Sequence, residues 1–256
     1  MVNTTRIIHR LCLCITLIGV DAAAATGPYQ VPPDTPQFIR DAVTARDRAN
    51  EHRARDSERH PAEVLALSGV KPGDRVIELA AYGQYYSTLL SELLGRKGRL
   101  EMFDLPYTEP FGGELGRAFE AAHDNTRYHQ VDYNDADFPT RVDVVFNVLT
   151  YHDLQAHGVD TALLNRKVFR ALKRGGAYVV IDHMAEDGSG WRDAARLHRI
   201  GVETIIAEVL DAGFELAARS ELLAHPEDDR MQLVFTPSIR GGTARAVLIF
   251  RKPANR

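Results

Sequence analysis

The sequence is poor in cysteine. Its 256 residues contain two, Cys12 and Cys14, and both lie close to the N-terminus. The chain beyond Cys14 therefore forms no internal disulfide and supplies neither a thiolate nucleophile nor a zinc–thiolate site. Any chemistry in the rest of the chain must come from other side chains.

An excess of positive charge is also missing. The sequence holds 31 Lys and Arg against 35 Asp and Glu, which gives a formal net charge of −4. Nucleic-acid-binding proteins need a basic surface for the phosphate backbone, so this composition argues against a nucleic-acid partner. The motifs of three enzyme classes are absent as well: the G-x-x-x-x-G-K-[ST] loop of nucleotide hydrolases, the G-x-G-x-x-G loop of dinucleotide enzymes and the G-x-S-x-G turn of α/β-hydrolases.

Long apolar runs are scarce, and the clearest is LCLCITLIGV at residues 11–20. It follows Arg6 and Arg10 and precedes Ala23 and Ala25, which have the spacing of a signal-peptidase site. This pattern predicts a cleaved secretory signal peptide over residues 1–25. The run is shorter than the roughly 20 residues that span a bilayer. We therefore expect a periplasmic or secreted protein without membrane insertion after cleavage; an uncleaved anchor is the alternative.

Residues 26–60 are expected to form a linker and a polar N-terminal helix. The proline-rich start TGPYQVPPDTP favours an extended chain, and a helix is predicted over 38–59. Its few apolar residues, Phe38, Ile39 and Val43, predict weak attachment to the rest of the protein. Its many arginines are expected on a solvated face, with the alternative that some of them cover an anionic ligand.

From residue 61 onward, predicted strands and helices alternate. The helices are expected at 61–70, 87–95, 114–123, 159–176 and 202–214, and the strands at 74–80, 98–104, 126–132, 142–150, 177–183, 214–222 and 244–252. Alternation of this kind predicts a parallel sheet covered by helices. No helix separates the last two strands, so they should pair antiparallel. We expect one α/β domain over 61–256: a Rossmann-like, doubly wound, three-layer αβα fold, mostly parallel with an antiparallel last strand.

This order of elements resembles that of class I S-adenosylmethionine-dependent methyltransferases. The stretch GVKPGDRVIELAAYGQYYSTLLSELLGRKGRL looks like their first strand, ligand loop and first helix, and LKRGGAYVVIDH looks like the region of their fifth strand. More narrowly, HPAEVLALSGVKPGDRVIEL, YHDL, DHMAEDGSG and LHRI resemble a bacterial group of exported, predicted methyltransferases. The resemblance covers roughly residues 45–253.

The resemblance implies that S-adenosylmethionine binds at the carboxyl ends of the strands. In the family, the first loop is an acidic residue followed by glycines, which let the backbone approach the ligand. Here Glu78 stands at the acidic position, whereas Ala80, Tyr82 and Gln84 stand at or near glycine positions. The cofactor-binding candidates in this loop are Glu78, Ala80, Gly83 and Tyr85.

Two further strand ends carry cofactor candidates. Asp104 closes the second strand, where a carboxylate commonly accepts the ribose hydroxyls. The resemblance implies an adenine contact from Asp132 and Tyr133 after the third strand. A helix-capping or loop role for Asp104 and a surface turn for Asp132 are the alternatives.

Histidine and carboxylate side chains follow the fourth and fifth strands. The first cluster is Tyr151-His152-Asp153, and the second is Asp182-His183. In the resembled sheet these strands are adjacent, so both clusters should face one cleft. A histidine oriented by a carboxylate can take a proton near neutral pH. The catalytic candidates are therefore His152, His183, Asp182 and Tyr151; we assign no metal.

Two alternatives compete for these side chains. His152, Asp153, Asp182 and His183 could bind a divalent metal instead, or the histidines could hold loops structurally. Weaker candidates for substrate contact follow in the next loop: Trp191, His198 and Arg199. Asp228, Asp229 and Arg230 are expected in a solvated turn between the last two strands.

The predicted function is methyl transfer from S-adenosylmethionine to a small-molecule acceptor. The alternative is a non-catalytic ligand-binding protein on the same fold that has lost the cofactor. Two features favour the alternative: the first loop has lost most of its glycines, and an exported compartment offers no obvious source of the cofactor. The oligomeric state is left open.

Overall fold

The computed structural model describes residues 28–254. The predicted signal peptide, with both cysteines, lies outside the described residues. Among the helices within this range, none is long and apolar enough to cross a membrane.

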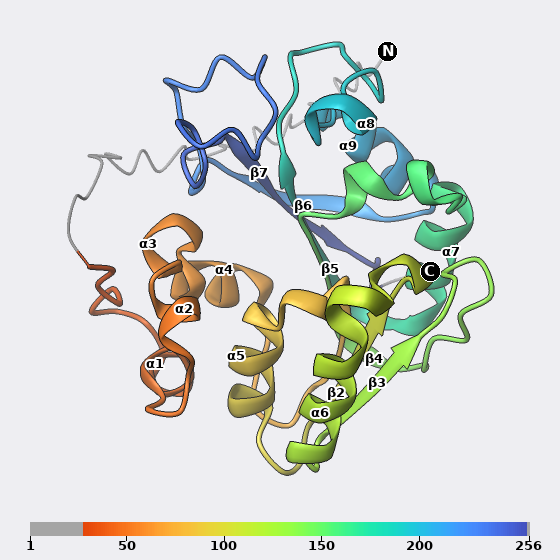
Figure 1. Cartoon of the computed structure of the whole chain (residues 1–256). Coiled ribbons are helices and arrows are strands. Elements are labelled where there is room, and N and C mark those ends of the chain that lie inside the picture. The colour runs from red at the N-terminus through yellow and green to blue at the C-terminus, as the bar shows by residue number, and fades with distance from the viewer. Residues whose placement is uncertain (1–27, 255–256) are drawn as a thin grey trace, which may run out of the picture.

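A seven-stranded sheet forms the centre of the protein, in the order β3-β2-β1-β4-β5-β7-β6 (Figure 1). Strands β1 to β4 pair in parallel with their neighbours, and β5 pairs in parallel with β4. Strand β7 lies antiparallel between β5 and β6. The prediction of a mostly parallel sheet with an antiparallel last strand is confirmed. The strands are β1 (Arg75–Leu79), β2 (Arg99–Asp104), β3 (Thr126–Gln130), β4 (Val142–Val148), β5 (Leu172–His183), β6 (Glu215–Ser220) and β7 (Arg245–Arg251).

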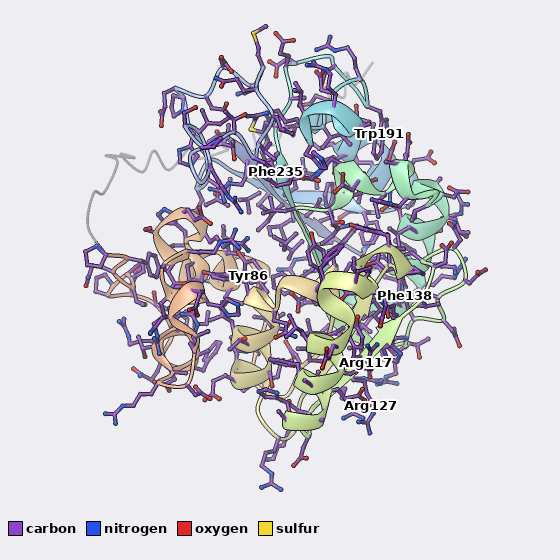
Figure 2. The ribbon with its side chains drawn as sticks, viewed as in Figure 1. Tyr86, Arg117, Arg127, Phe138, Trp191 and Phe235 are labelled. Atoms are coloured by element: carbon purple, nitrogen blue, oxygen red, sulfur yellow. The ribbon has the colours of Figure 1, made fainter. Side chains whose placement is uncertain are left out.

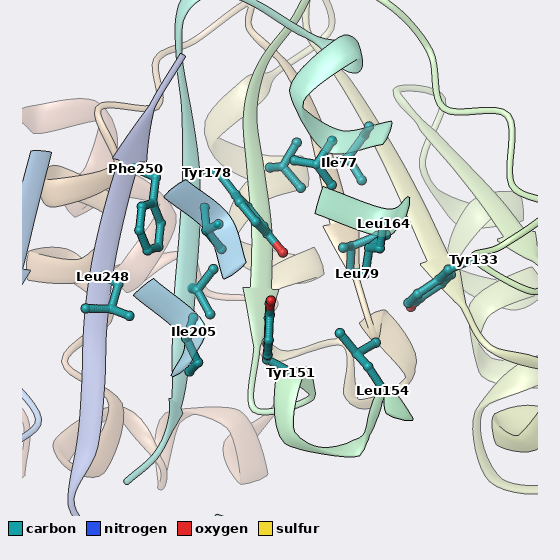
Figure 3. Packing of buried hydrophobic residues seen from close by; sticks show 14 of the residues in the cluster. Ile77, Leu79, Tyr133, Tyr151, Leu154, Leu164, Tyr178, Ile205, Leu248 and Phe250 are labelled. Atoms are coloured by element: carbon teal, nitrogen blue, oxygen red, sulfur yellow. The ribbon is translucent and has the colours of Figure 1, made fainter. Parts of the chain in front are cut away.

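Helices cover both faces of the sheet, because successive side chains of a strand point to opposite faces. In β5, Tyr178 and Val180 join the apolar cluster beneath α7 and α9, whereas Val179 and Ile181 join the cluster on the other face. Figure 3 shows the first cluster, with Tyr178 beside the helix residues that cover it. The three-layer prediction is confirmed. The helices are α1 (Gln37–Thr44), α2 (Asn50–Arg53), α3 (Asp56–Arg59), α4 (Pro61–Ser68), α5 (Tyr85–Leu94), α6 (Glu114–Ala122), α7 (Thr161–Ala171), α8 (Ala194–Leu197) and α9 (Val202–Asp211).

The N-terminal segment differs from the single, loosely attached helix expected over 38–59. It forms three short helices, α1 to α3, and α1 packs against α4 and α5. Ile39 and Val43 are buried there. Arg48 lies between the helices and makes a two-pronged ion pair with Asp56, at 2.8 and 2.9 Å. This buried pair folds the segment back on itself, so a continuous helix does not form.

The largest other difference in a boundary lies between α7 and β5. The predicted helix over 159–176 ends at Ala171, and β5 begins at the next residue. Lys252 donates to the carbonyls of Phe169 and Leu172 at this junction, both at 2.7 Å. These two contacts satisfy carbonyl groups that the helix end would leave unpaired.

Candidate functional site

A cavity of about 640 Å³ lies at the carboxyl ends of β1, β4 and β5. Its walls come from the loop after β1, the ends of β4 and β5, helix α3 and the connection between β6 and β7. Tyr86 on α5 and Phe235 in that connection both line it, and Figure 2 shows Phe235 above Tyr86. Its size is within the range of about 300–1,000 Å³ for small-molecule sites.

The loop after β1 keeps the backbone of a glycine-rich loop. Ala80 and Gln84 have φ angles of 58° and 52°, in the left-handed region, and a 3₁₀ turn (Ala81–Gly83) joins them. This region favours glycine because a Cβ atom is strained there. Ala80 and Gly83 line the cavity, as expected of cofactor-binding candidates. Side chains thus occupy positions where the backbone conformation calls for glycine.

Glu78 and Tyr85 flank this loop and also line the cavity. Ser87 donates to the Glu78 carboxyl, from Oγ to Oε2 at 2.6 Å. Burial raises the pKa of Glu78 to about 8, although the bond from Ser87 opposes this rise. The Tyr85 hydroxyl donates to Asp56 at 2.6 Å, so Tyr85 presents its ring rather than a free hydroxyl.

Replacing Glu78 by glutamine should flatten the pH dependence of stability between about pH 4.5 and 8. The folded-state pKa is raised above the unfolded one, so the folded protein holds a proton that the unfolded chain releases. The stability from this group is complete below the unfolded pKa and is lost as the pH rises through 8, by at most about 1.4 kcal/mol per pH unit. Urea unfolding at several pH values measures it. Glu92→Gln, at an exposed site on α5, is the matched control; equal slopes in wild type and Glu78→Gln would contradict the prediction.

The candidates after β2 and β3 lie outside the cavity. Asp104 is fully buried; its Oδ1 accepts from the Tyr82 backbone N–H at 3.0 Å and its Oδ2 from the Tyr128 hydroxyl at 3.1 Å. Burial raises the pKa of Asp104 to about 6. Both oxygens are thus engaged by the protein, and through Oδ1 Asp104 holds the loop after β1 in this structure.

The two residues that were expected to contact adenine also form hydrogen bonds within the protein. Tyr133 is fully buried; its hydroxyl donates to the Phe103 carbonyl at 2.9 Å and accepts from the Ala80 N–H at 3.0 Å. Asp132 accepts from the Asn134 N–H at 2.8 Å, in a turn. Tyr133 therefore supports the first loop from below rather than facing a ligand.

His152 and Asp182 form a buried pair between β4 and β5. Asp182 accepts from the His152 ring at 2.6 Å through Oδ1 and from the His152 backbone N–H at 2.8 Å through Oδ2. Burial lowers the pKa of His152, but Asp182 and Asp153 outweigh it and raise the pKa to about 10. The His152 ring therefore holds its proton at neutral pH, and a protonated ring does not suit the general-base role that the sequence suggested.

His183 is in the opposite state. Burial, together with Arg245 and His152, lowers its pKa well below the usual value, so the ring is neutral at pH 7. Its Nδ1 lies 3.0 Å from the Thr243 hydroxyl, and the ring lines the cavity 6.1 Å from the His152 ring, centroid to centroid. Two neighbouring histidines with pKa values pushed apart allow a division of roles, and His183 is the one able to accept a proton.

Tyr151 and Trp191 belong to the core rather than to the cavity wall. The fully buried Tyr151 hydroxyl donates to Glu208 at 2.7 Å and accepts from Asn165 at 2.8 Å, and Figure 3 shows the ring within the core. Trp191 donates to the same Glu208 carboxylate at 2.8 Å. Tyr151 therefore ties α7 and α9 to the end of β4, and Trp191 bonds to α9.

The structure also assembles residues that the sequence did not single out. Arg59 is 9% exposed, lines the cavity and stands 4.5 Å above the Tyr85 ring. Its Nε has no hydrogen-bond partner among residues 28–254, although it lies 3.7 Å from Oε1 of Glu58 in an ion pair. Arg55 and Arg245 line the same cavity. The only sequence signal was the arginine-rich segment, for which an anionic ligand had been the minor alternative.

Asp228 is not in a solvated turn. It forms a buried ion pair with Arg199, whose side chain is fully inaccessible, at 2.8 and 3.0 Å. Arg199 also donates to the carbonyls of Met184 and Gln232. The pair ties the connection between β6 and β7 to the end of β5, so Arg199 positions the cavity wall and is closed off from substrate.

The fold of this chain is similar to that of known proteins. Solved structures that match include a methyltransferase described as S-adenosylmethionine-dependent from Aquifex aeolicus (18% identity, 74% of this chain and 88% of that one, TM-score 0.54) and another from Mesorhizobium loti (19%, 74% and 96%, TM-score 0.53). The chain has the class I methyltransferase fold. No protein family's sequence profile matches, and no curated protein matches significantly.

A methyltransferase fold does not by itself decide the reaction. The [4+2]-cyclase SpnF matches this chain equally well (13% identity, 86% of this chain and 93% of that one, TM-score 0.57). Function therefore has to be argued from the residues of the cavity.

Proposed function

We propose that this chain transfers a methyl group from S-adenosylmethionine to a small-molecule acceptor, after export from the cytoplasm. The observation that carries the proposal is the position of the cavity, at the carboxyl ends of β1, β4 and β5 of a methyltransferase sheet. In open α/β sheets ligands bind at this edge. The acidic net charge supports a small molecule rather than a nucleic acid as the acceptor.

The described residues suit the methionine part of the cofactor. Glu78 offers carboxyl oxygens to an ammonium group, whose positive charge favours the ionised form of Glu78. The Nε of Arg59, which makes no hydrogen bond within the described residues, suits a carboxylate. The backbone of Ala80 and Gly83 lies at the cavity wall between them. When bound, the cofactor supplies an electrophilic methyl group on a sulfonium.

His183 is the group that we assign to the acceptor. Its neutral ring, held at Nδ1 by Thr243, is placed to take the proton that a hydroxyl or amine loses as its lone pair forms the new bond to carbon. The electron pair of the broken bond stays on sulfur, so charge and atoms balance. Val148, Leu149 and Phe235 give the cavity an apolar wall that limits water near the reacting atoms.

The alternative, a non-catalytic binding protein, is favoured by the adenosine side of the site. Tyr82 and Gln84 line the cavity at or near glycine positions of the family. The Asp104 carboxyl already accepts a hydrogen bond from the Tyr82 N–H. Adenosine binding as in the family requires this loop to shift.

Calorimetric titration with S-adenosylmethionine and S-adenosylhomocysteine separates the two functions. The proposed enzyme should bind both, and Arg59→Met should weaken the binding about 10-fold or more through loss of a charged partner. Arg117→Met, on an exposed surface pair with Glu109, is the control. Absence of heat at millimolar ligand would rule out the enzyme.

Replacing Tyr82 by glycine should tighten cofactor binding about 10-fold, since it removes a side chain from the cavity and restores a flexible loop. Tyr82→Phe keeps the ring and should bind like the wild type. The dissociation constant for S-adenosylhomocysteine measures the effect. Weaker binding by Tyr82→Gly would show that the ring contacts the ligand instead of obstructing it.

A further inference from the structure

Three metal-ligating side chains converge beside the cavity. The Nε2 atom of His152 lies 3.3 Å from Oδ1 of Asp153 and 3.2 Å from Nδ1 of His198, and the His198 and Asp153 atoms are 3.0 Å apart. His152 and Asp153 follow β4, whereas His198 ends α8, so the loops after two neighbouring strands contribute. Within residues 28–254 no other group of three such side chains comes as close together.

The triangle has the size of a metal coordination face. A divalent transition metal binds imidazole nitrogen and carboxylate oxygen at about 2.0–2.2 Å. With bond angles of about 90–110°, two ligand atoms at that radius are about 3.0–3.4 Å apart. All three distances fall in this range. Two histidines and one carboxylate form a donor set that suits zinc and iron(II) among other divalent ions.

The surroundings of His152 orient it as a metal ligand. Asp182, which is 1% exposed, accepts from the Nδ1 side of the ring at 2.6 Å and is itself fixed by the backbone N–H groups of His152 and His183. A carboxylate behind a histidine fixes its tautomer and turns the other nitrogen toward the ion. Nε2, the remaining ring nitrogen, is the one in the triangle, and a bound ion displaces the proton that this ring holds at neutral pH.

This ligand set differs from the one that the sequence suggested. Asp182 is used behind His152, and His183 is held by Thr243, so neither points to the triangle. His198 takes their place. Its ring is partly exposed and stands 4.9 Å from the Phe235 ring, centroid to centroid, at the cavity wall.

We propose that His152, Asp153 and His198 bind a divalent first-row transition-metal ion, with Asp182 as the supporting carboxylate. Three protein ligands leave coordination positions for water or for an oxygen of a bound molecule. His152 and Asp153 line the cavity, so that oxygen belongs to its occupant. The coordination of that oxygen rests on the proposed methyl transfer. It identifies the methyl acceptor as a small molecule with a hydroxyl or carboxylate oxygen that can ligate a metal. Metal binding itself does not depend on the reaction.

Cobalt(II) is the probe, because its visible absorption reports nitrogen and oxygen ligation directly. The full chain, stripped of metal with a chelator and desalted, should take up one equivalent with an absorption change. His198→Ala should weaken this binding at least 100-fold, and Asp153→Asn, a substitution of equal size, should weaken it as well. Asp182→Asn should weaken it about 10–100-fold through loss of the supporting carboxylate.

His157→Ala is the matched control, because His157 is an exposed histidine on the same loop as His152 and outside the triangle. It should bind cobalt like the wild type. Binding that His198→Ala and Asp153→Asn leave unchanged, or no stoichiometric uptake by the wild type, would overturn the metal site. Titration with S-adenosylhomocysteine on the same samples separates the two proposals: cobalt uptake without cofactor binding overturns methyl transfer alone, and cofactor binding without cobalt uptake overturns the metal site alone.

Discussion

Replacing Asp228 by asparagine is expected to lower the free energy of unfolding by about 3–5 kcal/mol. The Arg199 side chain is fully inaccessible and the Asp228 side chain is 1% exposed. Removal of the carboxylate charge leaves a guanidinium buried without its counter-ion, because its remaining partners are the neutral carbonyls of Met184 and Gln232. Asp228 also accepts from the Ala244 N–H at 2.7 Å, at the start of β7.

Urea denaturation followed by circular dichroism measures this change. Asp187→Asn is the control: Asp187 pairs with Arg230, but its side chain is 96% exposed, so its loss should leave stability unchanged. The double variant Arg199→Met/Asp228→Leu should recover much of the loss, because it removes both buried charges. A loss below about 1 kcal/mol in Asp228→Asn would mean that water reaches the pair.

This ion pair marks the kind of feature that the sequence could not show. Asp228, Asp229 and Arg230 form a run of charges, and such runs are usually solvated. The partner, Arg199, is 29 residues away, and nothing in the pattern joins the two. The same holds for Arg48 and Asp56, whose pairing turns an arginine-rich helix into three short ones. Pairing of charges across folded segments has no periodic signature.

The sheet, in contrast, was predictable because its signal is periodic. The continuous apolar run over 142–150 predicted a strand buried on both faces, and β4 is that strand. The missing helix between the last two strands predicted the antiparallel β6–β7 pair. Topology then predicted which strand ends would meet, and it correctly brought His152 beside Asp182 and His183.

Topology did not predict which way the strand-end side chains turn. Asp104 ends β2 at the expected position, but Tyr128 on the neighbouring strand and the Tyr82 backbone hold both of its oxygens. His152 and His183 differ in charge because one has carboxylates at hydrogen-bond distance and the other has Arg245 nearby. Such differences follow from three-dimensional neighbours, so equal residue types at equivalent strand ends acquire different roles.

Replacing His183 by glutamine is expected to lower kcat of methyl transfer by about 10²–10⁴-fold, the usual contribution of a positioned general base. Glutamine can still hydrogen-bond to Thr243 but cannot take a proton at neutral pH. Cofactor affinity should stay within about 2-fold of the wild type, because the groups assigned to the methionine part lie on α3 and after β1. Formation of S-adenosylhomocysteine with a panel of small hydroxyl and amine acceptors measures kcat, and calorimetry measures affinity.

A separate pair of variants distinguishes a proton acceptor from a merely structural ring. His123→Gln makes the same chemical change at the end of α6, where the ring stacks on Phe119 at 3.9 Å, outside the cavity wall, and it should leave kcat unchanged. Thr243→Val removes the hydroxyl that holds His183 and should lower kcat about 10-fold while cofactor affinity persists. The low pKa of His183 keeps its ring neutral on the acid side of pH 7, so wild-type kcat should not fall between pH 8 and about 6.5. If His183→Gln kept its kcat within a few-fold of the wild type, the proton would have to leave through another group or directly to water.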